Sequence, residues 1–133
     1  MADAVLLDTH ALLWWQEGAG RLGAGAVAAI DAADRILISP ISCWEVAMFV
    51  AKERVALDRP VGRWIDDLVS GTVGVAELTP RIATAAGSLV GFHGDPADRL
   101  IYATAAVDGL ALVTRDRRLA DHAEAHGDVR VVW

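Results

Sequence analysis

Four acidic residues stand where an α/β domain usually builds its sites: Asp8, Glu45, Asp98 and Asp116. Each ends a short apolar run or falls in the first turn of a predicted helix, and open α/β sheets bind ligands at the carboxyl ends of their strands. Two carboxylates ~4 Å apart repel each other by ~4 kcal/mol at an effective dielectric constant of ~20. A divalent cation removes this repulsion, and hard oxygen ligands select Mg²⁺ or Mn²⁺. The four residues therefore predict metal-dependent chemistry on phosphate.

Three of these carboxylates also suit the ends of helices. Asp8 and Asp116 each follow a predicted strand and can cap the helix that comes next. Ser42 and Glu45 have the spacing of a capping box, in which the glutamate caps its own helix. For Glu45 taken alone, the capping interpretation is the stronger one. A cap and a site are compatible at each of these positions.

The segment G-D-P-A-D-R distinguishes capping from ligand binding. Asp95 suits the N-cap, and Pro96 suits the first helical position. Asp98 then falls in the first turn, where the helix dipole gives an ionised carboxylate a mild advantage. Capping explains Asp95 fully and Asp98 weakly, so Asp98 is the stronger candidate for a metal ligand.

Short apolar runs alternate with helical segments along the chain. The predicted strands cover residues 5–8, 36–39, 73–78, 110–114 and 129–132. The predicted helices cover residues 10–15, 24–33, 42–53, 60–70, 80–89, 96–107 and 116–125. Apolar strands that alternate with helices indicate a parallel sheet covered on both faces. We expect an α/β fold, a three-layer α/β/α sandwich with a mostly parallel sheet of four or five strands.

Composition and charge exclude several classes of protein. The 133 residues suit one domain, and a hydrophobic content of 54% suffices for a folded core. A net charge of −6 argues against a protein that coats nucleic acid through bulk charge, but it is compatible with an enzyme that has an acidic metal site. The chain has one cysteine, no basic signal-peptide start and no apolar run that would span a membrane. We therefore predict a cytoplasmic protein with no membrane partner.

Arginine supplies eleven of the twelve basic residues, and it favours bidentate contacts with phosphate. We expect Arg99 and Arg115 to bind substrate, whereas a solvated helix face is the preferred interpretation for Arg118. Thr9 and Thr114 are candidates for hydrogen bonds to metal ligands, although helix capping is the preferred interpretation for Thr9. Because the histidines lack ligand spacing with cysteine, a zinc site is not expected.

Four segments together resemble one known family. They read V-L-L-D-T-H-A-L-L-W-W, I-S-C-W-E-V-A, H-G-D-P-A-D-R-L-I-Y-A-T-A and L-V-T-R-D. In this order they look like the PIN-domain nucleases, and most of all like the VapC-like toxins of type II toxin–antitoxin pairs. The resemblance runs from Val5 to Trp133, so residues 1–133 are expected to form a single PIN-like domain.

The resemblance implies a Mg²⁺- or Mn²⁺-dependent ribonuclease. Matched by motif, the acidic residues of the family fall on Asp8, Glu45, Asp98 and Asp116. Asp8 and Asp98 would be the main ligands of a first ion, and Asp116 would hold it directly, hold it through water, or help a second ion. Glu45 would orient a metal-bound water or act as a base. One ion and two ions both remain open.

The resemblance also implies partners. These are an RNA substrate with single-stranded or loop regions, a cognate antitoxin, and a second copy of the chain in a homodimer. Trp14 and Trp15 are adjacent on a predicted helix, about 100° apart, so one of them is a candidate for a partner groove. His93 is expected to shape the loop before Asp95.

Two alternatives to a nuclease fit the sequence less well. A non-catalytic PIN-like module would hold RNA or a protein partner without cutting, but it has no use for four clustered carboxylates. A phosphotransfer enzyme with an aspartyl-phosphate would need a second aspartate two residues after the first. Asp8 is followed by Thr9 and His10, which argues against that chemistry. Cleavage of DNA instead of RNA stays open.

Overall fold

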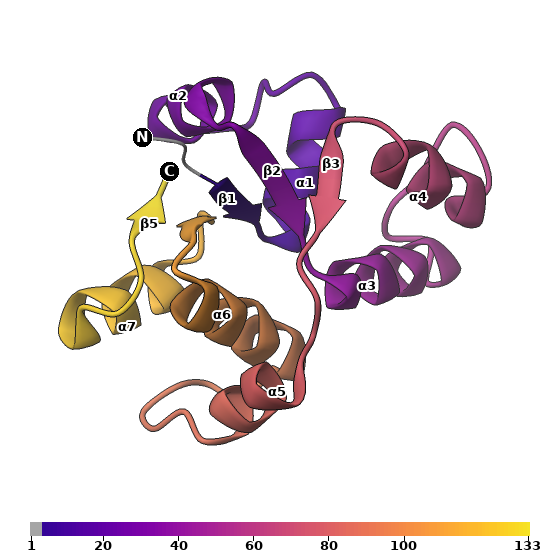
Figure 1. Cartoon of the computed structure of the whole chain (residues 1–133). Helices are drawn as coiled ribbons and strands as arrows, with labels where there is room; N and C mark the ends of the chain where they lie inside the picture. Colours follow the sequence, from indigo (N-terminus) through magenta and orange to yellow (C-terminus); the bar gives the residue numbers. More distant parts are fainter. Residues whose placement is uncertain (1–3) are drawn as a thin grey trace.

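Within residues 4–133, the part of the chain that the computed structural model describes, five short strands form one sheet (Figure 1). In chain order they are β1 (Ala4–Leu7), β2 (Arg35–Ile38), β3 (Val73–Val75), β4 (Ala111–Val113) and β5 (Val131–Val132). Their order across the sheet is β3-β2-β1-β4-β5, and every neighbouring pair is parallel. The predicted parallel sheet is confirmed.

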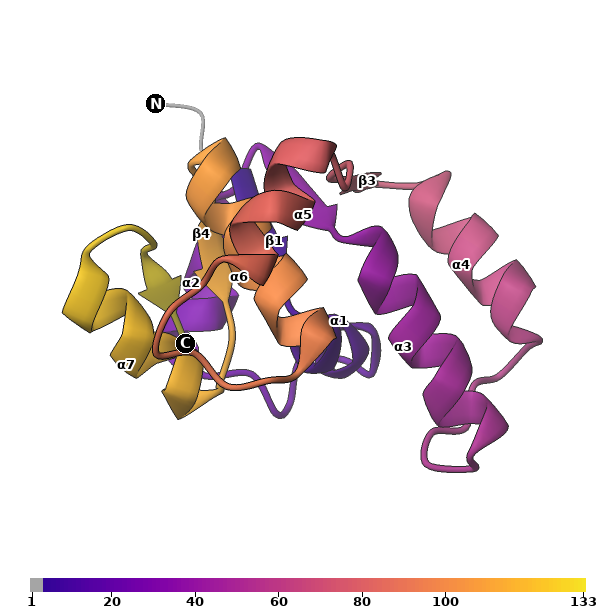
Figure 2. The ribbon, with the colours of Figure 1, turned by 90° about the horizontal axis from the view of Figure 1, so that it is seen from below.

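Helices cover both faces of this sheet (Figure 1 and Figure 2). They are α1 (Thr9–Gln16), α2 (Ala24–Ala32), α3 (Pro40–Ala51), α4 (Val61–Val69), α5 (Pro80–Gly87), α6 (Pro96–Asp108) and α7 (Arg117–His126). Side chains of α1 to α4 pack on one face, and those of α6 and α7 pack on the other. Helix α5 packs against α6, outside the sheet. This arrangement is the predicted three-layer α/β/α sandwich.

The strands form because their apolar side chains alternate between two buried faces. Val5 and Leu7 of β1 pack with α1 to α4, while Leu6 between them packs with α6 and α7. In β4, Val113 and Leu112 divide between the two faces in the same way. Burial on both faces explains why these strands are continuous apolar runs in the sequence.

The strand order brings the carboxyl ends of β1 and β4 together. After β1 the chain builds β2 and β3 toward one edge, and it then crosses to β4 and β5 on the other side of β1. Leu7 is in register with Val113, and the backbone N–H of Asp8 donates to Val113 O over 3.1 Å. A reversal of strand order of this kind is where open α/β sheets bind ligands.

Local capping sets both ends of α6. Its N-cap is Asp95, whose Oδ1 accepts the backbone N–H groups of Ala97 and Asp98. It ends at Gly109, where φ is +67°, a left-handed conformation that glycine adopts without strain. The N-cap agrees with the prediction, and Gly109 ends the helix as glycine commonly does.

Most boundaries differ from the prediction by one to three residues, and two of these shifts have a clear local cause. Strand β3 ends at Val75 instead of residue 78, because the chain leaves the sheet after the N–H of Ala76 donates to Ile38 O over 2.8 Å. Helix α3 begins two residues early, at Pro40, because Ser39 caps it and proline suits the first helical position. Among residues 4–133, no helix is long and apolar enough to cross a bilayer.

Candidate active site

The four predicted acidic residues line one pocket at the carboxyl ends of β1 and β4. Its volume is about 570 Å³. Asp8 caps α1, Glu45 lies in α3, Asp98 lies in α6, and Asp116 caps α7. The rest of the lining includes three arginines and three aromatic rings: Arg54, Arg115, Arg118, His10, Trp14 and Phe49. Folding thus gathers carboxylates from four separate elements into one place.

Both carboxylate oxygens of Asp8 are held by the protein. Oδ1 accepts the backbone N–H of Ala11 over 2.8 Å, as a helix cap does. Oδ2 accepts the hydroxyl of Thr114, and Thr114 Oγ1 in turn accepts the N–H of Asp116 over 3.0 Å. Burial raises the pKa of Asp8, and its two hydrogen bonds oppose that rise. Thr114 therefore connects the acidic residues that follow β1 and β4.

The capping interpretation of Glu45 is wrong. Ser39 caps α3, so Glu45 lies in the second turn and cannot complete a capping box with Ser42. Instead, Glu45 Oε1 accepts the hydroxyl of Thr9 over 2.5 Å. Thr9 is 3% exposed, and its oxygen also lies 2.9 Å from Ser42 Oγ. Burial raises the pKa of Glu45, and the hydrogen bond from Thr9 opposes the rise.

Thr9 therefore orients Glu45, which corrects the preferred capping interpretation of that threonine. Its hydroxyl has a single proton, which serves Glu45, so the proton of Ser42 completes the second contact. The two hydroxyls form a short buried chain beneath the carboxylate.

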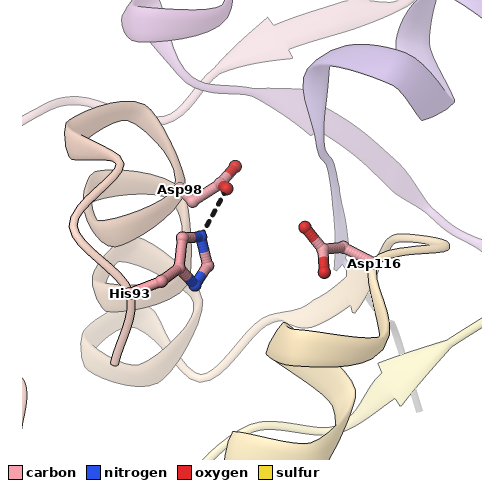
Figure 3. A group of neighbouring side chains, drawn as sticks. All are labelled: His93, Asp98 and Asp116. Carbon is pink, nitrogen blue, oxygen red and sulfur yellow. Dashed lines mark hydrogen bonds and ion pairs between the residues drawn. The ribbon is translucent and has the colours of Figure 1, made fainter. Parts of the chain in front are cut away.

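Asp98 and Asp116 lie across the pocket from each other, and His93 stands beside them (Figure 3). His93 Nε2 is 2.7 Å from Asp98 Oδ2. The three residues each offer one ligand atom, and these atoms lie within 4.8 Å of one another. Burial raises the pKa of Asp98, and the hydrogen bond from His93 opposes the rise. Among residues 4–133, these three residues are the one group whose ligand atoms lie close enough together to hold a metal ion. Asp8 lines the same pocket but lies outside this group.

Arg118 pairs with this acidic group. Its Nε and Nη2 lie 3.1 Å from Asp116 Oδ1 and 2.8 Å from Asp116 Oδ2, and Nη2 is 3.6 Å from Asp98 Oδ2. The guanidinium holds the pKa of Asp116 below its usual range. The expectation that Arg118 belongs to a merely solvated helix face is therefore wrong.

Arg99 is engaged within the fold. Its guanidinium donates to four backbone carbonyl oxygens, with distances from 2.9 to 3.3 Å. The acceptors belong to Ala86, Leu89, Phe92 and His93. Arg99 thus fastens the loop that carries His93, which favours a structural role over the expected contact with substrate.

Arg115 and Trp14 form part of the pocket wall. The Arg115 guanidinium lies 5.9 Å from the centre of the Trp14 ring, and Trp14 also contacts the ring of Trp133 edge-on. Trp15 packs against the core. Of the two adjacent tryptophans, Trp14 is thus the one at the site.

His93 is the residue whose place in the site was not anticipated. It does lie in the loop before Asp95, as expected, but its ring also stacks on Phe92 with centroids 4.6 Å apart and contacts Asp98. The sequence contains one indication of this role: His93 lies in the loop that leads directly to Asp98, a predicted metal ligand. The orientation of the His93 ring depends on Arg99, which donates hydrogen bonds to the loop carbonyls. These are tertiary contacts, which sequence spacing does not reveal.

The donor set suits a small, hard cation. Carboxylate oxygens that face one another match Mg²⁺ and Mn²⁺, and one imidazole beside them is compatible with Mn²⁺. Carboxylates that bind metals are themselves usually held by hydrogen bonds, as Thr114 holds Asp8 and His93 holds Asp98.

Comparison with known proteins agrees with this geometry. The sequence model of the PIN domain family matches residues 5–125. Ribonuclease VapC22 from Mycobacterium tuberculosis (strain ATCC 25618 / H37Rv) is 46% identical over 132 residues, which cover 97% of this chain and 98% of that protein. A toxin-antitoxin complex from Klebsiella pneumoniae contains a chain that is similar with a TM-score of 0.66 and 25% identity, covering 97% of this chain and 96% of that one.

The crystal structure of VapBC2 from Rickettsia felis bound to a DNA fragment from their promoter shares the fold, with a TM-score of 0.68, 14% identity and 96% of each chain covered. The family match spans most of the chain, and the mycobacterial relative is similar over nearly its whole length. With its parallel sheet and its acidic pocket at the β1/β4 junction, this chain belongs to the PIN domain family.

Proposed function

We propose that this protein is a metal-dependent endoribonuclease that hydrolyses RNA phosphodiester bonds, and that it is the toxin of a type II toxin–antitoxin pair. The observation that carries the proposal is the single pocket into which four separate elements bring Asp8, Glu45, Asp98 and Asp116. The relative with 46% identity, which is named a ribonuclease, supports RNA as the substrate.

Asp8, Asp98 and Asp116 would hold Mg²⁺ or Mn²⁺. An ion of this kind, when bound, neutralises charge that develops on the phosphate and makes water more acidic. The chain's own residues hold two of these three carboxylates in place: Thr114 donates to Asp8, and His93 contacts Asp98. His93 is a positioning residue in this scheme.

Glu45 suits the role of proton acceptor for the attacking water. Burial raises the pKa of Glu45 above its ordinary value, and a carboxylate with a higher pKa is a stronger base. The Thr9 hydroxyl engages Oε1, so we assign proton transfer to Oε2. The reaction is an in-line displacement: the water oxygen bonds to phosphorus, and one of its protons goes to Glu45. The bond from phosphorus to the ribose oxygen breaks, and that oxygen leaves with the bonding electron pair and takes up a proton from solvent water.

Two arginines of the pocket would hold the RNA backbone. Arg54 and Arg115 line the pocket beside the carboxylates, and arginine forms bidentate bonds with phosphate oxygens. A pocket of this kind reaches a backbone whose bases are unpaired, so single-stranded or loop RNA fits better than a duplex. Arg99 donates its hydrogen bonds to the loop carbonyls, so we do not assign it to the RNA backbone.

We also propose two protein partners: a cognate antitoxin and a second copy of the chain. The similar structure from Klebsiella pneumoniae is a toxin-antitoxin complex, which supports the first. For the second, light scattering of the purified protein should give twice the chain mass of 14.1 kDa.

The experiment is cleavage of a mixed pool of structured RNAs by the partner-free protein, in Mn²⁺, in Mg²⁺ and in EDTA. Wild type is compared with Asp8→Asn, and Asp31→Asn, an exposed aspartate on α2, is the matched control. We expect cleavage only with metal, in wild type and control. Cleavage by Asp8→Asn at the wild-type rate would remove Asp8 from the site, and metal binding without cleavage of any RNA would favour a non-catalytic module.

A further inference from the structure

Trp44 is an exposed aromatic residue directly beside the site. Its exposed fraction is 58%, whereas Val46, two residues later in α3, is fully buried. A large apolar side chain in this position is costly to leave in water, and exposed apolar surface of this kind commonly marks a binding site. Its chain neighbour is Glu45, the proposed base.

Trp44 forms a wall of a second pocket, of about 410 Å³, between α3 and the first turn of α6. The other apolar walls are Ile41, Met48, Pro96 and Ala97. This pocket and the acidic pocket share three lining residues, Glu45, Met48 and Asp95. An RNA strand with a phosphate in the acidic pocket therefore has the Trp44 pocket within reach of the adjoining nucleotide.

The two pockets differ in chemistry. Three arginines line the acidic pocket, while no basic side chain of the described residues lines the Trp44 pocket. The Trp44 pocket is therefore unsuited to a phosphate and suited to a flat, largely apolar group. Unpaired RNA bases are commonly held by stacking on aromatic side chains.

Asp95 adds a polar group at the edge of this pocket. Its Oδ1 accepts the backbone N–H groups of Ala97 and Asp98 at 2.9 Å and 3.2 Å. Oδ2 accepts no hydrogen bond from residues 4–133. Carboxylates recognise bases through exocyclic amino groups such as N4 of cytosine, so Oδ2 favours a base that carries an amino group over uracil.

We propose that the Trp44 pocket binds one unpaired nucleobase next to the cleaved phosphodiester, stacked on Trp44 with its amino group on Asp95, and so sets a base preference for cleavage. The inference rests on the proposed ribonuclease function and adds a specificity site to it. Continuity with the acidic pocket is what selects RNA as the occupant over a protein segment.

The first experiment compares base frequencies around the cut in a randomised RNA pool. The variants are Trp44→Ala, Trp44→Phe and Asp95→Asn, with Val69→Ala, another exposed apolar residue outside both pockets, as the control. Wild type and Val69→Ala should disfavour uracil at one position beside the cut. Trp44→Ala should lose that preference, Trp44→Phe should keep most of it, and Asp95→Asn should accept uracil while still capping α6.

The second experiment uses one RNA cut by wild type, with and without an abasic nucleotide at that position. Trp44→Ala should lower kcat/KM by ~10- to 100-fold, the range that base–aromatic stacking spans. The abasic RNA should lower wild-type kcat/KM to a similar degree. The two changes together should cost little more than either one, because both remove the same contact.

The outcomes separate this inference from the proposed function. Metal-dependent cutting with an unchanged base profile in Trp44→Ala would overturn the base pocket and leave the ribonuclease intact. A changed oligomeric state of Trp44→Ala by light scattering, with the base profile unchanged, would reassign the surface to a protein contact. If wild type cuts no RNA in any metal, the ribonuclease proposal fails first, and the base pocket fails with it.

Discussion

The Arg118 guanidinium binds both carboxylate oxygens of Asp116, with its Nη2 also 3.6 Å from Asp98. One cationic group of the chain thus spans two of the proposed metal ligands. A metal ion that binds Asp116 must compete with this pair. Because the Arg118 side chain is 62% exposed, solvent screens the pair and the competition is modest.

Arg118→Met should therefore tighten Mn²⁺ binding, by about two- to fivefold for an exposed ion pair. The methionine keeps much of the aliphatic length and removes the charge. Isothermal titration with Mn²⁺ measures the change, with Arg117→Met, the exposed neighbour, as control. Weaker Mn²⁺ binding in Arg118→Met alone would show that Arg118 supports the site.

Thr9 orients Glu45, and its hydroxyl is the atom that matters. Thr9→Val preserves the shape of the side chain but leaves Glu45 Oε1 without its donor. We expect kcat to fall ~10- to 100-fold, as is typical when support for a site residue is removed, with Mn²⁺ affinity nearly unchanged because Glu45 lies outside the closest ligand group.

Thr9→Ser keeps the hydroxyl and should retain most of the activity. The informative measurement is single-turnover cleavage at saturating Mn²⁺ for both variants. Equal losses in the valine and serine variants would mean that packing of the methyl group, and not the hydrogen bond to Glu45, is what the site requires.

The pH dependence follows from three partly buried carboxyl groups. Burial raises the pKa of Asp8, Glu45 and Asp98, and each must be ionised to hold a cation or accept a proton. Activity and Mn²⁺ affinity should therefore both decline as pH falls through a range above the ordinary carboxyl pKa of ~4. Isothermal titration with Mn²⁺ across this pH range tests Asp8 and Asp98, and a pH–rate profile at saturating Mn²⁺ tests Glu45. An acid limb at or below the ordinary range in both measurements would contradict the prediction.

Local sequence rules accounted for the parts of this molecule that local interactions determine. Asp95, Pro96 and Gly109 mark the ends of α6 through capping and backbone conformation alone. Asp8 and Asp116 lie just after β1 and β4, as their position after apolar runs predicts. Parallel strands bring their carboxyl ends to one edge of the sheet.

The remaining features depend on contacts between segments far apart in the chain. The S-x-x-E spacing of Ser42 and Glu45 imitated a capping box, but the adjacent Ser39 and Pro40 start the helix first. What Glu45 then contacts is set by Thr9, which belongs to another helix. No spacing rule shows where such a contact falls, because the packing of α1 against α3 determines it.

Packing of the last residue against α2 provides a test of the fold that is independent of the site. A Cβ added at Gly25 would lie 2.4 Å from the backbone oxygen of Trp133, whereas one added at Gly62 in α4 would meet nothing within 4 Å. Gly25→Ala should lower the free energy of unfolding by about 1–3 kcal/mol through overpacking. Gly62→Ala should raise it by about 0.4–1 kcal/mol.

Urea unfolding of the two variants gives the comparison directly. Because the substitution is the same and both positions are helical, helix propensity cancels to first order. Equal stability of Gly25→Ala and Gly62→Ala would mean that the close approach of Trp133 to α2 is absent in solution.

The most direct test of the central claim compares two aspartates three positions apart on α6. Asp98→Asn and Asp95→Asn each remove one charge and keep the shape. Asp98 belongs to the proposed metal group, whereas Asp95 caps the helix and is proposed to contact only the base beside the cut. At saturating Mn²⁺, single-turnover RNA cleavage by Asp98→Asn should fall by at least ~100-fold, and Asp95→Asn should stay within about tenfold of wild type, as asparagine also caps well. Equal rates for the two variants, whether both high or both abolished, would contradict the assignment of this pocket as the active site.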